Sequence, residues 1–514
     1  MTATLPTSVA EPVSTRRAWA AVAVLSASLL VVTMDMTILN IALPEMSAEL
    51  RPSATQQLWV VDVYSLVLAG LLVSFAAIAD RVGRKRMLMT GYAIFLVASL
   101  LVLLADTAES VIALRAFLGI GGAMIMPNTL SLIRVIFTDA GKRATALSIW
   151  AAVSGLGAAV GPFVGGFLLE HFSWHAAFLV NVPLMVVAII AGLLVLPESR
   201  VVGAGPWDAL AAALSLVGMV LVVWALKDFG KKATFADPTA LLALVVGVGA
   251  LAWFVRRCLH SAHPLLDISL FRNRPFSAGI IAALGTTFAM LAALLLLTQW
   301  LQLVDHASPI QSGIKLIPVA LAAATASLLA PPLAHRLGAR TVLAGGLALA
   351  GVGLLVVGFG PDVLTYRLVL VAMLLVGAGT GSLAIASAMI MLGSPEDKAG
   401  NAGALEETSY ELGGTLGVAV LGSISALVYK DHLASSKALE QAGPEAARQA
   451  QDSLGAATAT ADQLGLPALA HDACAAFTQS LQTAGLVGGV LMLVVAATVF
   501  VLTPRGTDIG GTTH

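Results

Sequence analysis

Fourteen long apolar runs, separated by mostly short polar breaks, constrain this chain more than any other feature of its sequence. Each run approaches the roughly 20 apolar residues that a helix needs to cross a bilayer. Of all residues 58% are hydrophobic and only 11% are charged, too little charge for the surface of a soluble protein of this size. The sequence therefore predicts an all-α membrane protein with fourteen spans, at approximately 19–41, 57–79, 87–105, 109–133, 144–168, 175–196, 207–226, 238–256, 276–303, 311–334, 341–359, 364–392, 400–428 and 480–503.

The distribution of basic residues predicts the orientation, because cytoplasmic loops carry an excess of Lys and Arg. The breaks on one side of the predicted membrane contain Arg16, Arg17, Arg81, Arg84, Lys85, Arg86, Lys142, Arg143, Arg200, Arg256, Arg257, Arg272, Arg274, Arg336, Arg340, Lys398 and Arg505. The short loops on the other side contain only Arg51, Lys227, Lys231, Lys232 and Arg367. An even number of spans puts both termini on one side, so we expect both termini to be cytoplasmic.

This topology places the polar segment 429–479 outside the cell, where its composition predicts a short amphipathic helix or loose coil rather than a folded domain. It also places Cys258 and Cys474 on opposite faces of the membrane, so we expect no disulfide between them. The first apolar run is too long for a signal peptide and lacks a small-residue cleavage site, so we interpret it as the first span.

Two pairs of similar segments indicate an internal repeat. ADRVGRK at 79–85 resembles AHRLGAR at 334–340, and the segment that begins KRATALS at 142 resembles the one that begins KAGNAGA at 398. Chance similarity between glycine-rich helices is the alternative. A repeat relates the first six spans to the last six, with the substrate site of such transporters between the two halves near the midplane. The predicted organisation is a cytoplasmic tail at 1–18, a six-helix bundle at 19–200, two inserted helices at 201–260, a second six-helix bundle at 261–505 that includes the external loop, and a cytoplasmic tail at 506–514.

The stretch ALEETSYE at 404–411 places three carboxylates within an apolar run. In a helix, Glu407 and Glu411 share one face, whereas Glu406 is rotated by about 100° from Glu407. Burial and the nearby like charge both oppose ionisation, so we expect this pair to hold a proton at neutral pH more readily than a surface glutamate, and to titrate jointly. A lipophilic cation and a proton would then compete for the same negative charge. We expect Glu407 and Glu411 to form this exchange site. Glu406 and Asp62 are further candidates for substrate binding, although Glu406 could instead satisfy a packing partner.

Aromatic side chains would help such a site, because aromatic faces hold delocalised or quaternary cations. Tyr410 is adjacent to the carboxylates in sequence. The other candidates come from different spans: Trp59, Tyr64 and Trp150.

Three further charged residues lie within predicted spans. Asp35 lies deep in the first span, and an intramembrane Asp is a functional candidate by default, although it could instead make a structural hydrogen bond to a neighbouring helix. Asp62 lies less than two turns from the outer end of the second span and could be an ordinary interfacial residue. Arg115, the only deep arginine, could pair with a buried carboxylate or relay protons.

The loop ADRVGRKR lies between the second and third spans. Asp80 can accept a hydrogen bond from another helix or cap the next one, and Gly83 permits a tight turn. Arg81 and Arg84 would anchor the loop to lipid headgroups.

The fifth span contains GLGAAVGPFVGG. Gly157, Gly161 and Gly165 recur every four residues, so they line one helix face and permit close packing. Pro162 removes one helix hydrogen bond and allows a bend. Ordinary packing of small residues would account for the same pattern.

No enzyme motif competes with these features. The sequence has no P-loop and no GxSxG nucleophile elbow, and its histidines lack the spacing of metal ligands. We therefore expect no enzymatic activity, no cofactor and no metal, so transport would have to run on an ion gradient. The expected partners are lipophilic cations, protons and the lipid bilayer, with no nucleic acid, and we expect a monomer.

Together these motifs resemble those of the fourteen-span drug/proton antiporters of the major facilitator superfamily. D-R-x-G-R-K resembles the signature loop of the superfamily, although Ala76 stands where that pattern begins with Gly. G-x-x-x-G-P-x-x-G-G resembles the pattern of its antiporters, and D-x-T-x-x-N-x-A-L-P, at 35–44, resembles the first-span signature of the family. Longer strings resemble the multidrug pumps that export quaternary ammonium antiseptics and dyes: VVTMDMTIL, SATQQLWVVDVYSLVLAG, MIMPNTLSLIRVIF and GNAGALEETSYELG. The resemblance covers nearly the whole chain apart from the first 15 residues and 429–479.

The resemblance implies roles for individual residues. Asp35 matches the first-span acid that the family ties to proton coupling, and Arg115 stands where the superfamily has an arginine. The residues that match acids at corresponding places are Asp62, Glu406 and Glu407, and Glu411 stands where close relatives have Asp. Some relatives carry another Asp, linked to bivalent cations, where this chain has Ala323, so our hypothesis is a preference for monovalent lipophilic cations.

The predicted function is proton-coupled export of lipophilic cations across a bacterial plasma membrane. A dedicated self-resistance exporter for one antibiotic and an uptake system are alternatives with the same fold. A non-transporting receptor or scaffold is a third, but it would have no reason to keep intramembrane acids.

Overall fold

A computed structural model describes residues 14–50, 52, 54–200, 208–232, 236–261, 264–395 and 398–506. Every regular element within these ranges is a helix, which confirms the predicted all-α class. The predicted boundary segments 201–207 and 262–263 lie outside the described residues, as do 1–13 and 507–514.

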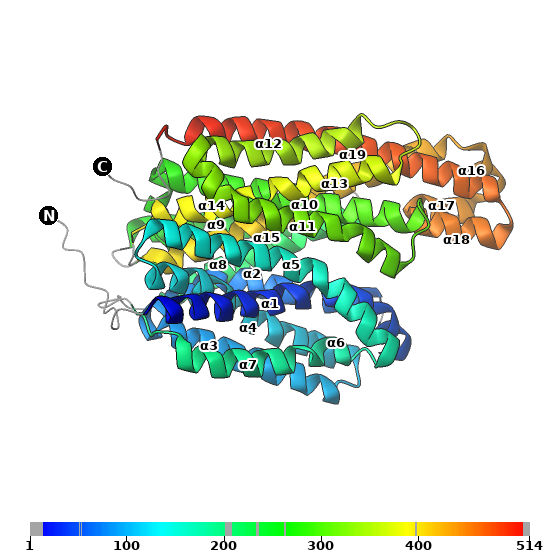
Figure 1. The fold of residues 1–514 in the computed structure, drawn as a ribbon. Coiled ribbons are helices and arrows are strands. Elements are labelled where there is room, and N and C mark those ends of the chain that lie inside the picture. The colour runs from blue at the N-terminus through cyan, green and yellow to red at the C-terminus, as the bar shows by residue number, and fades with distance from the viewer. Residues whose placement is uncertain are drawn as a thin grey trace.

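The helices form two bundles and an inserted hairpin (Figure 1). The first bundle contains α1 (Thr15–Leu50), α2 (Ala54–Val82), α3 (Arg84–Leu101), η1 (Val102–Leu104), α4 (Ala108–Ile136), α5 (Ala140–His171), α6 (Ala176–Leu179) and α7 (Asn181–Val195). The hairpin is α8 (Ala209–Lys232) and α9 (Pro238–His260). The second bundle contains η2 (Ile268–Arg272), α10 (Arg274–Leu303), α11 (Pro309–Leu337), α12 (Ala339–Gly358), α13 (Tyr366–Gly379), α14 (Ser382–Leu392), α15 (Ala399–Ala434) and α19 (Pro467–Leu502).

Thirteen stretches in the described ranges are long and apolar enough to cross a membrane. The remaining predicted span corresponds to α5, a helix of 32 residues. At 1.5 Å per residue α5 exceeds the roughly 30 Å of a bilayer core, and it packs along α1 inside the bundle. The chain is therefore a multi-pass membrane protein.

The predicted twelfth span, 364–392, is divided between α13 and α14. Its glycines allow α11 to approach closely: a Cβ at Gly377 would lie 2.5 Å from the carbonyl oxygen of Val319, and one at Gly381 would lie 2.7 Å from the carbonyl carbon of Ala326. Close packing of this kind is what small residues provide in membrane helices.

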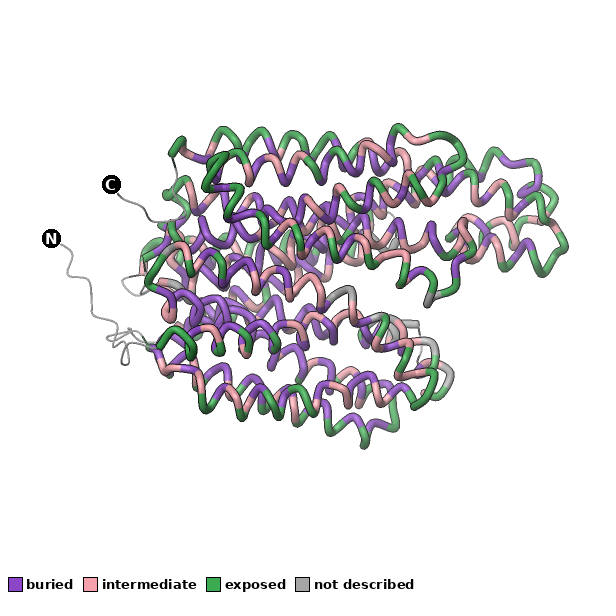
Figure 2. The backbone as a smooth tube through the Cα atoms, viewed as in Figure 1, coloured by how far each residue is buried: buried purple, intermediate pink, exposed green. Residues whose placement is uncertain are grey.

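Helix packing follows the predicted relation between the two halves. α5 packs along α1 in the first bundle, as α15 packs along α10 in the second. Between the bundles, α5 meets α11 and α15 meets α2, which are equivalent contacts if the bundles are related by two-fold pseudosymmetry. Figure 2 shows exposed residues along the outer faces of the outermost helices and buried residues toward the contacts between them.

The beginning of α1 and the end of α19 lie at the same end of the bundle, which we call the terminal end (Figure 1). At the opposite, distal end lie three short helices: α16 (Lys437–Gln441), α17 (Pro444–Asp452) and α18 (Leu454–Leu464). The prediction of one short helix or loose coil for 429–479 was therefore wrong. Leu439, Leu454 and Leu469 are buried against the same core as the spans, so this segment has enough apolar residues to pack.

Candidate functional site

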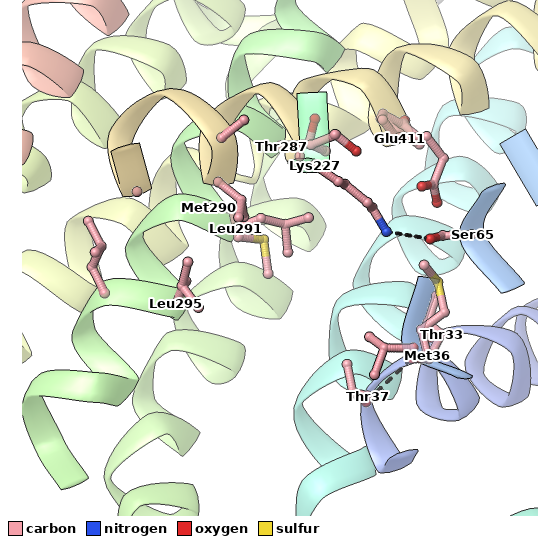
Figure 3. A pocket seen from close by; sticks show the side chains of 18 of the residues that line it. Thr33, Met36, Thr37, Ser65, Lys227, Thr287, Met290, Leu291, Leu295 and Glu411 are labelled. Carbon is pink, nitrogen blue, oxygen red and sulfur yellow. Dashed lines mark hydrogen bonds between the residues drawn. The ribbon is translucent and has the colours of Figure 1, made fainter. Parts of the chain in front are cut away.

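A cavity of about 740 Å³ lies between the two bundles. The part of its lining that Figure 3 labels comes from α1, α2, α8, α10 and α15: Thr33, Met36, Thr37, Ser65, Lys227, Thr287, Met290, Leu291, Leu295 and Glu411. The lining continues toward the distal end at Tyr429, Leu454 and Phe477. A large, mainly apolar cavity with a few polar groups is the usual form of a small-molecule site.

Two of the three predicted glutamates line this cavity. Glu407 and Glu411 lie one turn apart on α15 and belong to its wall, whereas Glu406 does not. Glu407 is 1% exposed, and neither of its carboxylate oxygens has a hydrogen-bond partner among the described residues. If Glu407 is ionised, no hydrogen bond from a described residue offsets the cost of burying its charge, so a cation or a proton is needed to neutralise it.

Glu406 is fully buried behind the cavity wall, and its Oε1 accepts hydrogen bonds from hydroxyl groups. Tyr410 Oη donates at 2.5 Å and Ser387 Oγ also donates. These bonds connect α15 to α14, as the packing alternative for Glu406 requires. Because Glu406 does not line the cavity, its position speaks against the substrate-binding role that we predicted.

Asp62 also lines the cavity and is paired with a residue that the sequence analysis assigned to a loop. Lys227 Nζ lies 3.1 Å from Asp62 Oδ1. It also donates a hydrogen bond to Ser65 Oγ at 2.6 Å (Figure 3). The apolar run that predicted the seventh span ends at 226, but α8 continues to Lys232, so Lys227 lies within the helix. Its position directly after an apolar run was the only sequence signal available.

Asp35 lies behind the cavity wall, where it forms a buried ion pair with Arg115. Arg115 Nη1 lies 2.7 Å from Asp35 Oδ2, and the two side chains are 2% and 1% exposed. Asn181 Nδ2 donates a second hydrogen bond to Asp35 Oδ1 at 2.8 Å, a partner that sequence analysis missed. Asp35 therefore joins α1 to α4 and α7. Arg115 also lines the cavity, so its guanidinium connects Asp35 to the cavity.

Three of the four aromatic candidates line the cavity and one does not. Tyr64, Trp150 and Tyr410 line the cavity, and the guanidinium of Arg115 stacks over the Tyr64 ring, 4.5 Å from its centroid. Trp59 does not line this cavity. Its side chain is 40% exposed at the beginning of its span, as expected of an interfacial tryptophan.

The predicted signature loop is held by the end of the first bundle. Arg84 is completely buried, its Nη2 lies 2.9 Å from Asp80 Oδ1, and its backbone N–H donates to the carbonyl oxygen of Ser199 at 2.8 Å. The prediction that Arg84 anchors to headgroups was therefore wrong, because its charge is satisfied inside the protein. Arg81 is half-buried and donates to the carbonyl oxygen of Ala77 at 2.5 Å.

Gly83 has φ = 121°, a region that strongly favours glycine, and a Cβ there would lie 2.6 Å from Glu198 Oε1. The turn that Gly83 was predicted to form is therefore confirmed. Gly338 has φ = 85° at the equivalent place of the second half.

The glycines of α5 pack against α1. A Cβ at Gly157 would lie 2.8 Å from the carbonyl oxygen of Leu30, one at Gly161 would lie 2.9 Å from that of Met34, and one at Gly165 would lie 2.9 Å from the Ile38 side chain. Pro162 lies within α5, but its side chain is outside the described part of the structure. On α15, Gly413 and Gly417 approach the α10 backbone in the same manner.

Two helical bundles around a central cavity are typical of secondary transporters. The sequence profile of the Major Facilitator Superfamily matches residues 25–418, and the chain belongs to that superfamily. The chain is 40% identical to the multidrug efflux pump LfrA of Mycolicibacterium smegmatis, over 94% of this chain and 96% of that protein. It is 36% identical to the methyl viologen resistance protein SmvA of Salmonella typhimurium, over 87% of this chain and 90% of that protein. The crystal structure of the human organic anion transporter MFSD10 has the same fold, with a TM-score of 0.59 and 14% identity over 92% of this chain and 99% of that one.

These relatives confirm the predicted superfamily and the resemblance to drug efflux pumps. The chain is thus a transporter of a bacterial drug-efflux family rather than an enzyme. Its family implies a location in the plasma membrane.

Proposed function

We propose that this protein exports lipophilic cations, such as quaternary ammonium compounds and cationic dyes, in exchange for protons. We further propose that the terminal end faces the cytoplasm. The observation that carries the proposal is the pair Glu407 and Glu411 on one wall of the cavity, with Glu407 lacking a hydrogen-bond partner among the described residues.

The exchange rests on competition for one negative charge. A carboxylate buried in apolar surroundings is costly unless it is neutralised, and either a proton or a substrate cation can do this. A cation entering from the cytoplasm displaces the proton from the glutamate pair, and a proton entering from outside displaces the cation. Tyr64, Trp150 and Tyr410 supply aromatic faces for the cation.

Asp35 takes part in proton coupling through Arg115. The guanidinium contacts Asp35 on one side and reaches the cavity on the other, so a change of charge in the cavity alters the strength of the ion pair. Since Asp35 also holds α1 against α4 and α7, that change acts on the packing of the first bundle.

The cavity favours monovalent cations over bivalent ones. Ala323, which stands where some members of the family have an acid, lines the cavity and adds no charge to it. SmvA is named for resistance to methyl viologen, a dication, so this preference is a point on which the chain would differ from that relative.

Transport by reconstituted protein tests the proposal. In proteoliposomes with an imposed pH gradient, the wild type is expected to move ethidium and to move protons in the opposite direction. Asp35→Asn and Glu407→Gln each remove one acid without changing its size, and each is expected to reduce exchange at least tenfold. Ethidium movement without proton movement, or full activity in both variants, would show that the mechanism is wrong.

A further inference from the structure

The cavity extends along α15 well beyond the two glutamates. Residues of α15 line it from Glu407 as far as Tyr429. At 1.5 Å per residue, Tyr429 lies about 27 Å from Glu411 along the helix axis. We call the far part of the cavity the distal arm, and its wall is formed by α15 between Val418 and Tyr429, by Leu295 and Gln299 of α10, by Leu454 of α18 and by Phe477 of α19.

The charged residues of the cavity wall lie outside the distal arm. Leu412 of α15 packs in one cluster with Leu66 of α2 and Val223 of α8. Asp62 and Lys227 each lie one turn from the member of this cluster on their own helix, so their charges are level with the middle of α15. Among the described lining residues, the charged ones are Asp62, Arg115, Lys227, Glu407 and Glu411.

The distal arm offers mainly aliphatic and aromatic surface. Tyr429 Oη donates to the carbonyl oxygen of Ala450 at 3.0 Å, so its hydroxyl is engaged with α17 and its ring is left to the cavity. Ser425 Oγ shares a hydrogen bond with Ser480 Oγ of α19 at 2.9 Å. In Figure 3, Leu295 lies apart from the charged groups of Lys227 and Glu411.

A substrate bound at the glutamates can extend in one direction along α15. Among the described residues of this helix, Glu407 is the first that lines the cavity. Before Glu407 the helix packs against α4, where a Cβ at Gly403 would lie 3.1 Å from the carbonyl oxygen of Pro127. The part of a substrate that follows α15 away from the glutamates therefore enters the distal arm.

We propose that the distal arm binds the alkyl chain of single-headed cationic amphiphiles whose head group lies at Glu407 and Glu411. This inference rests on the proposed export of lipophilic cations, and it names n-alkyl quaternary ammonium compounds as the class that fills the whole cavity. It also gives α18 a part in substrate binding, because Leu454 lines the arm. Affinity then grows with chain length, since each buried methylene removes apolar surface from water.

A leucine placed in the distal arm tests the inference. Among the described residues, a Cβ at Gly422 would meet Leu295 Cδ2 alone, at 4.0 Å, so Gly422 leaves space between α15 and α10 that a larger side chain would fill. Kd is measured by calorimetry on purified full-length protein for dodecyltrimethylammonium and for tetraphenylphosphonium, a compact monocation without an alkyl chain. Gly422→Leu is expected to weaken binding of dodecyltrimethylammonium by at least about tenfold, the effect of excluding roughly two methylenes. It is expected to change the Kd of tetraphenylphosphonium by less than about twofold.

Three further variants separate the chain from the head group and from general packing. Gly249→Leu adds the same side chain on α9, outside the cavity, where Gly249 is exposed and a Cβ would meet nothing within 4 Å, so both Kd values should stay unchanged. Glu407→Gln should weaken both cations, because both lose the same charge. Ala426→Leu adds bulk one turn farther along the arm and replaces Gly422→Leu if that variant does not fold. All proteins are measured in the same detergent, so partition of the ligands into micelles cancels from the ratio of variant to wild type.

The outcomes distinguish the two proposals. If a folded Gly422→Leu protein binds both cations as the wild type does, or binds both equally more weakly, the distal arm is not a chain site and the proposed function stands. If Glu407→Gln leaves both Kd values unchanged, the head group does not lie at the glutamates and the inference is overturned. Binding of neither cation by the wild type overturns both proposals.

Discussion

Glu406 and Glu407 are adjacent in sequence but have opposite surroundings. Glu406 accepts hydrogen bonds from Ser387 and Tyr410, whereas Glu407 has no hydrogen-bond partner among the described residues and lines the cavity. A side chain that bonds another helix contributes to stability, as Glu406 does through Oε1, although its Oε2 has no partner among the described residues. A carboxylate without such bonds in a cavity wall is available to a ligand. We therefore expect replacement by glutamine to affect mainly stability at Glu406 and mainly transport at Glu407.

Glu406→Gln is expected to lower stability with little loss of transport. Its amide has one acceptor oxygen and no charge, so the bonds from the two hydroxyls weaken, at a cost of about 1–2 kcal/mol. Glu407→Gln loses no bond to a described residue, so its stability is expected to stay within about 0.5 kcal/mol of the wild type while transport falls. Thermal unfolding in detergent and ethidium transport in proteoliposomes measure the two effects. Loss of transport in Glu406→Gln at unchanged stability would contradict this division of roles.

For single residues, the sequence predicted the helix face on which a side chain lies better than it predicted the residues that the side chain contacts. The i, i+4 spacing was enough to separate Glu406 from Glu407 and Glu411, because helix geometry is local. Lys227 and Asn181 could not be assigned, since their partners lie 165 and 146 residues away along the chain. Only the tertiary fold brings those pairs together. The ion-pair partner of Arg84, Asp80, is only four residues away, but the burial of Arg84 and its bond to Ser199, 115 residues along the chain, depend on the tertiary fold in the same way.

Among the elements, α5 and α15 show how glycine spacing sets the distance between helices. Gly161 is expected to be intolerant of a larger residue, because a Cβ there would lie 2.0 Å from Thr37 Oγ1 and 2.9 Å from the Met34 carbonyl oxygen. The hydroxyl can rotate but the backbone cannot, so Gly161→Ala should force α5 away from α1 and destabilise the protein by about 1–3 kcal/mol.

Gly166 provides the matched control on the same helix. A Cβ at Gly166 would meet nothing within 4 Å, and Ala is a better helix former than Gly. Gly166→Ala is therefore expected to be neutral or slightly stabilising in the same thermal unfolding measurement. Equal effects of the two substitutions would mean that close packing of α1 and α5 is not what Gly161 provides.

Hydropathy predicted the spans because each must satisfy the same local condition, a long apolar stretch. It could not predict α16, α17 and α18, whose apolar residues are spaced among polar ones and are buried where these short helices meet one another, α15 and α19. The close approach of α11 to Gly377 and Gly381 of the twelfth predicted span likewise could not be predicted, because hydropathy does not include neighbouring helices.

In the whole molecule, the cavity extends toward the distal end while the two halves meet at the terminal end. Arg134 of α4 donates hydrogen bonds to the side chain of Ser394 at 3.1 Å and to its carbonyl oxygen, and it is 7% exposed. A Cβ at Gly403 of α15 would lie 3.1 Å from the carbonyl oxygen of Pro127 of α4. Alternating access requires these contacts to break when the cavity opens to the other side.

Arg134→Ala is expected to increase the population that is open at the terminal end. Loss of charge-assisted bonds between the halves removes roughly 2 kcal/mol, which corresponds to a shift of about thirtyfold in the conformational equilibrium. Spin labels on cysteines that replace Thr145 of α5 and Leu337 of α11, with Cys258 and Cys474 changed to Ser, report the separation of the two halves at that end. The variant should show a longer distance that is rare in the wild type.

Arg86→Ala is the control, because Arg86 is exposed and pairs with Glu198 of its own half. Identical distance distributions for Arg134→Ala and the wild type would mean that this contact does not hold the terminal end closed.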